Sequence, residues 1–291
     1  MVAAHTTAML PITVGAGTYS VVCRNLGDNE GVGDHDATFT VKQATNTGTV
    51  AGRLPVRTDD FIEPIARYRT FVADQTTALL DDLGRVRTAL ARNDTAGARD
   101  AYARAHADFV AIGVAYDALG DTGTAIAGGM RKLEHELWDG TPPAAASAVA
   151  EITNAAQKLR DDADSLVIDP LAYVRQAHET MEAALQDAAS GVDHPASHTG
   201  IVDVAAAIKG SHFAVGTMQS LVDRYLELKS LNTRFDRLDA VVTKLADRTA
   251  PGGFRPDNAL TATERTALSG ALGGVLEPLG LMAGLLEPED A

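Results

Sequence analysis

Apolar residues recur at steps of three and four along most of this 291-residue chain, from Asp59 onwards. The first run contains Phe61, Ile65, Tyr68 and Val72. Such spacing places the apolar side chains on one face of an α-helix. Further helices are expected near 95–118, 126–138, 144–165, 170–190, 200–229, 231–247 and 261–285. About eight helices with no strand between them predict a mainly α fold, as one helical bundle or two bundles side by side.

Residues 1–48 have a different composition, rich in Thr, Val and Gly. The clearest strand candidates there are Thr18–Cys23 and Ala37–Val41, two β-branched or aromatic runs separated by a stretch rich in Gly and Asp. A β segment of this size could hardly be stable alone. The sequence therefore predicts two parts, a β segment over 1–48 and a helical domain over 49–291.

The chain is acidic, with a formal net charge of -14. Nucleic-acid binding needs a basic face, so this charge argues against a nucleic-acid partner. Acidity suits cation binding, and it suits simple solubility as well. The sequence contains no run of about 18 uninterrupted apolar residues, so it predicts no membrane-spanning helix. The first residues lack the basic and apolar regions of a signal peptide, which leaves a cytosolic protein or a removed leader as the options.

The densest group of ionisable residues lies between Met130 and Trp138. On a helix, Arg131, Glu134, His135 and Trp138 share one face. A carboxylate and an imidazole that project into a bundle could bind iron or zinc. The alternative is a partly exposed face in which the arginine forms a salt bridge.

A second group contains His178, Glu179 and Glu182. His178 and Glu182 stand one helical turn apart and could contact one ion together, although such pairs are also common on solvated helices. Asp121 and Tyr116 precede the first group and could add oxygen ligands.

Other polar residues are expected to be structural. His106 and His212 lie within predicted helices and are interpreted as packing or surface residues. Ser197 and Thr199 are expected to cap the start of a helix. The single tryptophan, Trp138, is interpreted as an anchor in the bundle core.

The chain has one cysteine, Cys23, so it can form no internal disulfide. The strand ending at Cys23, the loop with His35 and the strand that follows resemble the C-terminal hairpin of a cupredoxin. Cupredoxin copper sites also need a histidine from an earlier strand and a weak axial ligand. Both are missing here, so copper is disfavoured and a buried thiol is expected.

Short stretches along the helical part occur in the same order as in one known family. They are Leu54–Val56, Tyr68–Val72, Ala105–His106, Gly113–Tyr116, Gly120–Asp121, Leu133–Glu134, Leu137–Trp138, Ala177–Glu179 and Glu182–Leu185. Over about 50–285, the chain resembles the EfeO/imelysin-like family, in particular actinobacterial EfeO-like iron-uptake proteins.

The resemblance implies an imelysin-like double helical bundle around a cleft, preceded by the end of a cupredoxin domain. It implies an extracytoplasmic, non-enzymatic accessory protein that binds or delivers iron in an EfeUOB-type system of the cell envelope. The implied partners are an EfeU-like permease and an EfeB-like haem peroxidase. Contact with the membrane would require a lipid anchor on a removed leader.

The chain departs from the family at its metal-binding motif, Gly-x-His-x-x-Glu. The corresponding residues are Gly129–Glu134, with Arg131 at the position of the histidine. A guanidinium stays protonated and has no lone pair for a metal. Val110 and Gly123 stand at two further acidic positions of the family, so Glu134 and Asp121 remain from that set.

Two functions follow as alternatives. The first is an iron-binding (or zinc-binding) protein that uses Glu134, His178, Glu179, Glu182 and Asp121. The second is a degenerate homologue without metal, a partner- or anion-binding scaffold in which Arg131 and Lys132 contact the anion. Hydrolysis is disfavoured because, without the motif histidine, no zinc-activated water can be assembled. Carboxylates converging on Glu134 would favour metal, and a pocket filled by Arg131 would favour the scaffold.

Overall fold

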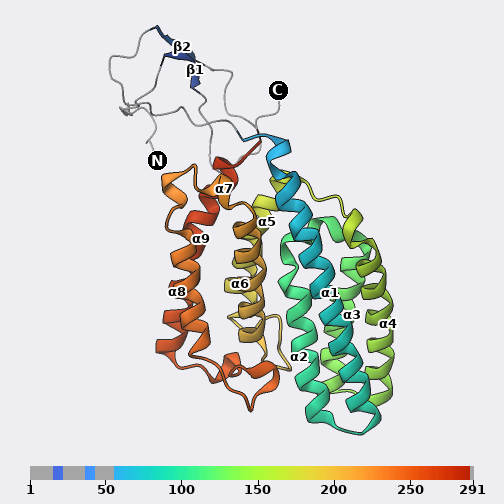
Figure 1. Ribbon diagram of the computed structural model, residues 1–291. Helices are drawn as coiled ribbons and strands as arrows, with labels where there is room; N and C mark the ends of the chain where they lie inside the picture. Colours follow the sequence, from blue (N-terminus) through green and yellow to red (C-terminus); the bar gives the residue numbers. More distant parts are fainter. Residues whose placement is uncertain (1–15, 22–36, 43–55, 289–291) are drawn as a thin grey trace. The chain divides into compact units, whose positions relative to one another are not determined.

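The computed structural model describes residues 16–21, 37–42 and 56–288 (Figure 1). The chain divides into two compact units, Met1–Pro55 and Val56–Ala291. The division into a β part and a helical part matches the change in composition. The boundary predicted at residue 48 lies outside the described residues and stays a prediction.

The first unit contains a two-stranded antiparallel sheet of β1 (Gly17–Val21) and β2 (Ala37–Val41). Tyr19 stands opposite Phe39, and their rings stack with centroids 5.5 Å apart. Such cross-strand aromatic pairs stabilise short sheets. The prediction of two short strands near the N-terminus is confirmed, and the likeness to a cupredoxin stays a prediction.

The second unit is helical, as predicted. Its α-helices within the described residues are α1 (Ile62–Ala91), α2 (Thr95–Ala111), α3 (Tyr116–Trp138), α4 (Pro142–Asp162), α5 (Pro170–Ala183), α6 (Gly200–Thr217), α7 (Gln219–Val222), α8 (Leu231–Thr243) and α9 (Ala262–Leu285). A π-helical turn at Ala184–Ala188 continues α5.

Three of the predicted helices have different bounds in the structure. The helix expected over 95–118 ends at Ala111, and α3 starts at Tyr116 instead of near residue 126. Gly120, with a φ of 51°, bends α3 and is the residue type that tolerates this conformation. The helix expected over 200–229 is divided among α6, α7 and a 3₁₀ turn, Leu226–Leu228.

The helices pack in two groups, which Figure 1 shows in blue to green and in yellow to red. Helices α1 to α4 contact one another, with the pairs α1–α2 and α3–α4 in the longest contact. Helices α5, α6, α8 and α9 form the second group. Because α6 also packs along α2, the two groups share a seam that contains the polar cluster described below.

Small and aromatic residues set the spacing at this seam. A Cβ on Gly210 of α6 would lie 1.9 Å from the carbonyl oxygen of Ala111, so only glycine allows this close approach of α6 to α2. The buried rings of Tyr68 and Tyr173 meet edge to face nearby, 5.3 Å apart. The Tyr173 hydroxyl lies 2.7 Å from Thr217 Oγ1, and this hydrogen bond satisfies both buried groups.

Helix α9 is the one helix in the described part of the chain that is long and apolar enough to cross a membrane, by length and composition alone. Its most apolar window has a mean hydropathy of 1.4. Leu272, Val275 and Leu279 of this helix are fully buried, and the helix packs against α5 and α8. Some of the apolar side chains of α9 therefore belong to the core of the helical unit.

Candidate metal centre

Three side chains that commonly bind metals meet at the seam between α2 and α6. They are His106 from α2, His194 from the segment before α6, and Asp203 from the first turn of α6. The ligand atoms that they offer all lie within 4.8 Å of one another. Two imidazoles and one carboxylate at this separation could hold a metal ion.

Hydrogen bonds hold the cluster together. His106 Nδ1 lies 3.0 Å from Asp203 Oδ1 and 2.9 Å from Oδ2, and His194 Nε2 bonds to the same Oδ2. The two imidazole rings are perpendicular, with centroids 4.7 Å apart. The side chains of His194 and Asp203 are 1% and 4% exposed, and that of His106 is 16% exposed. The cluster is therefore buried, with its accessible side at His106.

The segment that carries His194 is anchored on both sides of the histidine. Glu134 Oε1 accepts hydrogen bonds from the backbone N–H of Ser197 at 2.9 Å and from its hydroxyl at 2.7 Å. Asp257 accepts from His198 Nδ1 at 3.1 Å and from the backbone N–H of Gly200 at 3.3 Å. These hydrogen bonds fix the backbone of the segment that precedes α6 and thereby orient the side chain of His194.

Glu134 also lies behind the metal-binding cluster. Its Oε1 is 3.8 Å from Nδ1 of His194, a buried atom with no hydrogen-bond partner among the residues that the structure describes. The carboxylate therefore provides negative charge on the side of the imidazole that faces away from Asp203. An acidic neighbour of this kind raises the basicity of an imidazole ligand.

The pKa shifts reflect strong pairing within the cluster. Burial alone would raise the pKa of the Asp203 carboxyl, but His106 and His194 outweigh burial and hold that pKa well below its usual range. Burial alone would lower the pKa of the His194 imidazole, but Asp203 and then Glu134 raise it above its usual value. These acidic neighbours favour the protonated form of His194, and metal binding would require its neutral form.

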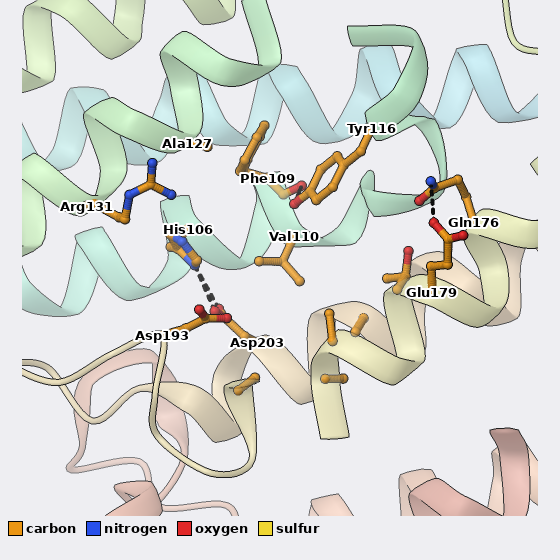
Figure 2. Close-up of a pocket in the computed structure, with 15 residues that line it drawn as sticks. His106, Phe109, Val110, Tyr116, Ala127, Arg131, Gln176, Glu179, Asp193 and Asp203 are labelled. Carbon is orange, nitrogen blue, oxygen red and sulfur yellow. Dashed lines mark hydrogen bonds and ion pairs between the residues drawn. The ribbon is translucent and has the colours of Figure 1, made fainter. Parts of the chain in front are cut away.

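A cavity of about 370 Å³ opens beside the cluster. Figure 2 draws His106, Asp203, Asp193 and Arg131 towards one end of the cavity, and Gln176 and Glu179 towards the other. Between the two ends the wall is mostly apolar, with Phe109, Val110, Ala127, Ala183, Ala184 and Ala207. A small molecule could therefore approach the cluster from one side.

Two charged residues, Asp193 and Arg131, line the end of the cavity that lies beside the cluster. Burial, and then the charge of Asp187, raises the pKa of the Asp193 carboxyl. Arg131 has no hydrogen bond or ion pair with any residue that the structure describes. The cavity therefore combines a set of metal ligands with an unpaired guanidinium.

The residues predicted as metal ligands do not lie together in one group. Glu134 is buried beside the cluster, as described above. His178 and Glu182 lie on α5, 3.9 Å apart, outside the three-residue group, and Glu182 accepts a hydrogen bond from Gln186. Asp121 is exposed on α3. The structure therefore gathers other residues into the group that could bind a metal.

Glu179 is the second predicted ligand on the cavity wall. It accepts a hydrogen bond from Gln176 Nε2 at 2.7 Å and lies 3.0 Å from Nε of Arg175. These partners hold it towards the end away from His106 (Figure 2).

The remaining predicted positions near Glu134 divide between surface and core. His135 is exposed and lies 3.8 Å from Asp139. Lys132 bonds to Glu151 at 2.9 Å, away from the cavity wall. Trp138 packs against the core, with the Arg99 guanidinium 4.8 Å from its ring, in line with the anchor expected there.

Sequence reasoning missed the cluster itself. His106 was interpreted as a packing or surface residue, and the structure adds that its imidazole bonds to Asp203 within the cluster. A usable signal was the position of Asp203, which stands between Val202 and Val204 in the apolar start of a helix. A carboxylate in such an apolar run is a candidate for burial, and a buried carboxylate needs a positively charged or hydrogen-bonding partner.

The copper question concerns Cys23 and His35, which lie outside the described residues, and the buried thiol expected for Cys23 stays a prediction.

No model of a protein family matches this chain. The search of curated proteins likewise found no match.

Proposed function

We propose that this protein binds a transition-metal ion, iron in the first place, through His106, His194 and Asp203. The observation that carries the proposal is the meeting of two imidazoles and one carboxylate in a largely buried cluster, of which His106 and Asp203 line a cavity. Two histidines and a carboxylate with open positions are a typical Fe²⁺ site, and zinc is also bound by such sets.

The resemblance of the sequence to the EfeO/imelysin-like family supports a role in iron uptake. Under this proposal, the helical part is an imelysin-like double bundle and the protein is an extracytoplasmic accessory that binds or delivers iron. Its partners would be an EfeU-like permease and an EfeB-like haem peroxidase. Arg131 replaces the motif histidine, and the imidazoles would come from His106 and His194.

The second candidate function is a metal-free scaffold that binds an anion or a partner. Arg131 lies in the cavity wall and its guanidinium has no partner over the described ranges of the chain, which favours this alternative. The two candidates differ in whether the protein binds a metal ion by itself.

Calorimetry on chelator-stripped protein separates the two candidates. We expect binding of Fe²⁺, under anaerobic conditions, and of Zn²⁺ with a Kd of about 1 µM or tighter. His194→Ala should weaken this binding by at least about tenfold, because it removes one of three ligands. His178→Ala is the matched control, since His178 lies outside the cluster.

A thermal-shift measurement provides a second test, and the Tm of each variant without metal shows whether the variant is folded. A metal at about 100 times its Kd stabilises the native state by about 2.7 kcal/mol, so the wild-type Tm should rise with added Zn²⁺. Equal affinity in His194→Ala and wild type, or loss of binding in the control alone, would refute the assignment. An absence of any metal binding would leave the scaffold function.

A further inference from the structure

Three protein ligands do not complete the coordination of a metal ion at the cluster. Zinc takes four ligands and iron up to six, so one to three positions stay open. The side of the cluster near His194 is closed by Glu134 and Ser197, both buried. His106 and Asp203 line the cavity. The open positions therefore face the cavity.

The cavity wall offers a positive charge beside these positions. Arg131 lines the same cavity, towards the end that holds His106 and Asp203 (Figure 2). Its guanidinium has no partner among the residues that the structure describes. Lys132, the next residue along α3, is neutralised by Glu151 instead. A guanidinium is the donor best shaped to hold a carboxylate through two parallel hydrogen bonds.

The rest of the cavity suits a small organic group. A volume of about 370 Å³ is within the range of small-molecule sites. Most of the wall is apolar, with Phe109 and Val110 on one side and alanines of the α5 end on another. Thr180 also lines the cavity and adds a polar residue to this otherwise apolar stretch of wall.

We propose that the cavity binds a small organic carboxylate together with the metal. One carboxylate oxygen takes an open coordination position of the ion, Arg131 pairs with the carboxylate, and the organic body lies along the apolar wall. This inference rests on the proposed metal binding. Asp193 lines the same end of the cavity and opposes the anion by its negative charge, so the metal and Arg131 together must outweigh it.

Cobalt provides the test, because the visible absorption of bound Co²⁺ changes when a new ligand enters its coordination shell. Chelator-stripped protein is first titrated with Co²⁺ alone, which tests the proposed function by itself. The Co²⁺-loaded protein is then titrated with butyrate, and in parallel with butyramide, its uncharged analogue of the same shape. We expect a saturable spectral change with butyrate and none with butyramide.

The variants assign the effect to the guanidinium. Arg131→Met should bind Co²⁺ as wild type does and weaken butyrate binding by about tenfold or more, since one charge-assisted pair is lost. Lys132→Met is the matched control, because it removes a neighbouring positive charge that does not face the cavity. Asp193→Asn should act in the opposite direction and tighten butyrate binding.

The outcomes are distinguishable. A Co²⁺ spectrum that does not respond to butyrate overturns the carboxylate site and leaves the metal site standing. Equal losses in Arg131→Met and Lys132→Met also overturn it, because the effect would then be a general one of charge. If wild-type protein binds no Co²⁺, the proposed function fails, and this inference fails with it.

Discussion

The clearest stability prediction concerns Asp108, a carboxylate on α2 outside the metal centre. One of its oxygens, Oδ2, is buried and finds no hydrogen-bond partner within the described part of the chain. Burial, and then the negative charge of Asp82, raises its pKa from 3.8 to about 7, although Lys209 acts in the opposite direction. The folded state therefore holds a proton that the unfolded state releases, so stability falls as the pH rises from about 4 to about 7.

The magnitude follows from the difference between the two pKa values. About three pH units correspond to at most about 4 kcal/mol at 1.36 kcal/mol per unit. The side chain is partly accessible, and solvent screening reduces this figure to about 1–2 kcal/mol. Asp108→Asn removes the charge and keeps the shape, so it should stabilise the fold by that amount at about pH 8 and change it little at about pH 4.

Urea denaturation at the two pH values measures this effect. Asp121→Asn is the control, because Asp121 is exposed and should show no change at either pH. A loss of stability in Asp108→Asn at about pH 8, or a gain as large at about pH 4, would refute the reasoning.

Three further substitutions test the packing of the helices at and beside the seam by denaturant unfolding. Gly210→Ala should cost about 2–3 kcal/mol, because the new Cβ would meet the carbonyl oxygen of Ala111 at 1.9 Å; a neutral result would mean that α6 can move away from α2. Ser197→Ala should cost about 1–2 kcal/mol, since Glu134 loses one of its two buried donors, and an unchanged midpoint would show that water replaces the hydroxyl. Tyr173→Phe should cost about 1 kcal/mol through loss of the bond from its hydroxyl to the threonine near the end of α6, and Tyr19→Phe, in the separate β unit, should leave that transition unchanged.

The helices and strands were largely predictable from local pattern. The spacing of Phe61, Ile65, Tyr68 and Val72 predicts α1, and the residues between the β-branched runs predict a break between two strands. The start of α3 was not predictable in the same way. A glycine with positive φ at Gly120 usually ends a helix, but here the helical pattern continues through the bend, because buried Leu119 and Ile126 pack on either side of it.

The candidate site was only partly predictable. Glu134 was identified because a carboxylate near an imidazole on one helix is a local pattern. His106, His194 and Asp203 are separated by up to 97 residues along the chain, and only tertiary packing brings them together. Periodicity says which side of a helix is apolar, but it does not say which helix lies opposite. Because α6 packs against α2 through Gly210, Asp203 meets His106, and no local pattern encodes this contact.

The placement of the cluster on the seam has a mechanical consequence. His106 belongs to the α1–α4 group, whereas Asp203 belongs to the group of α5, α6, α8 and α9. An ion held by both would act as a staple across the two groups, and its removal would cut one strong cross-link between them. Amide hydrogen exchange should then slow in α2 and α6 together when metal is added, and quicken in both when a chelator withdraws it.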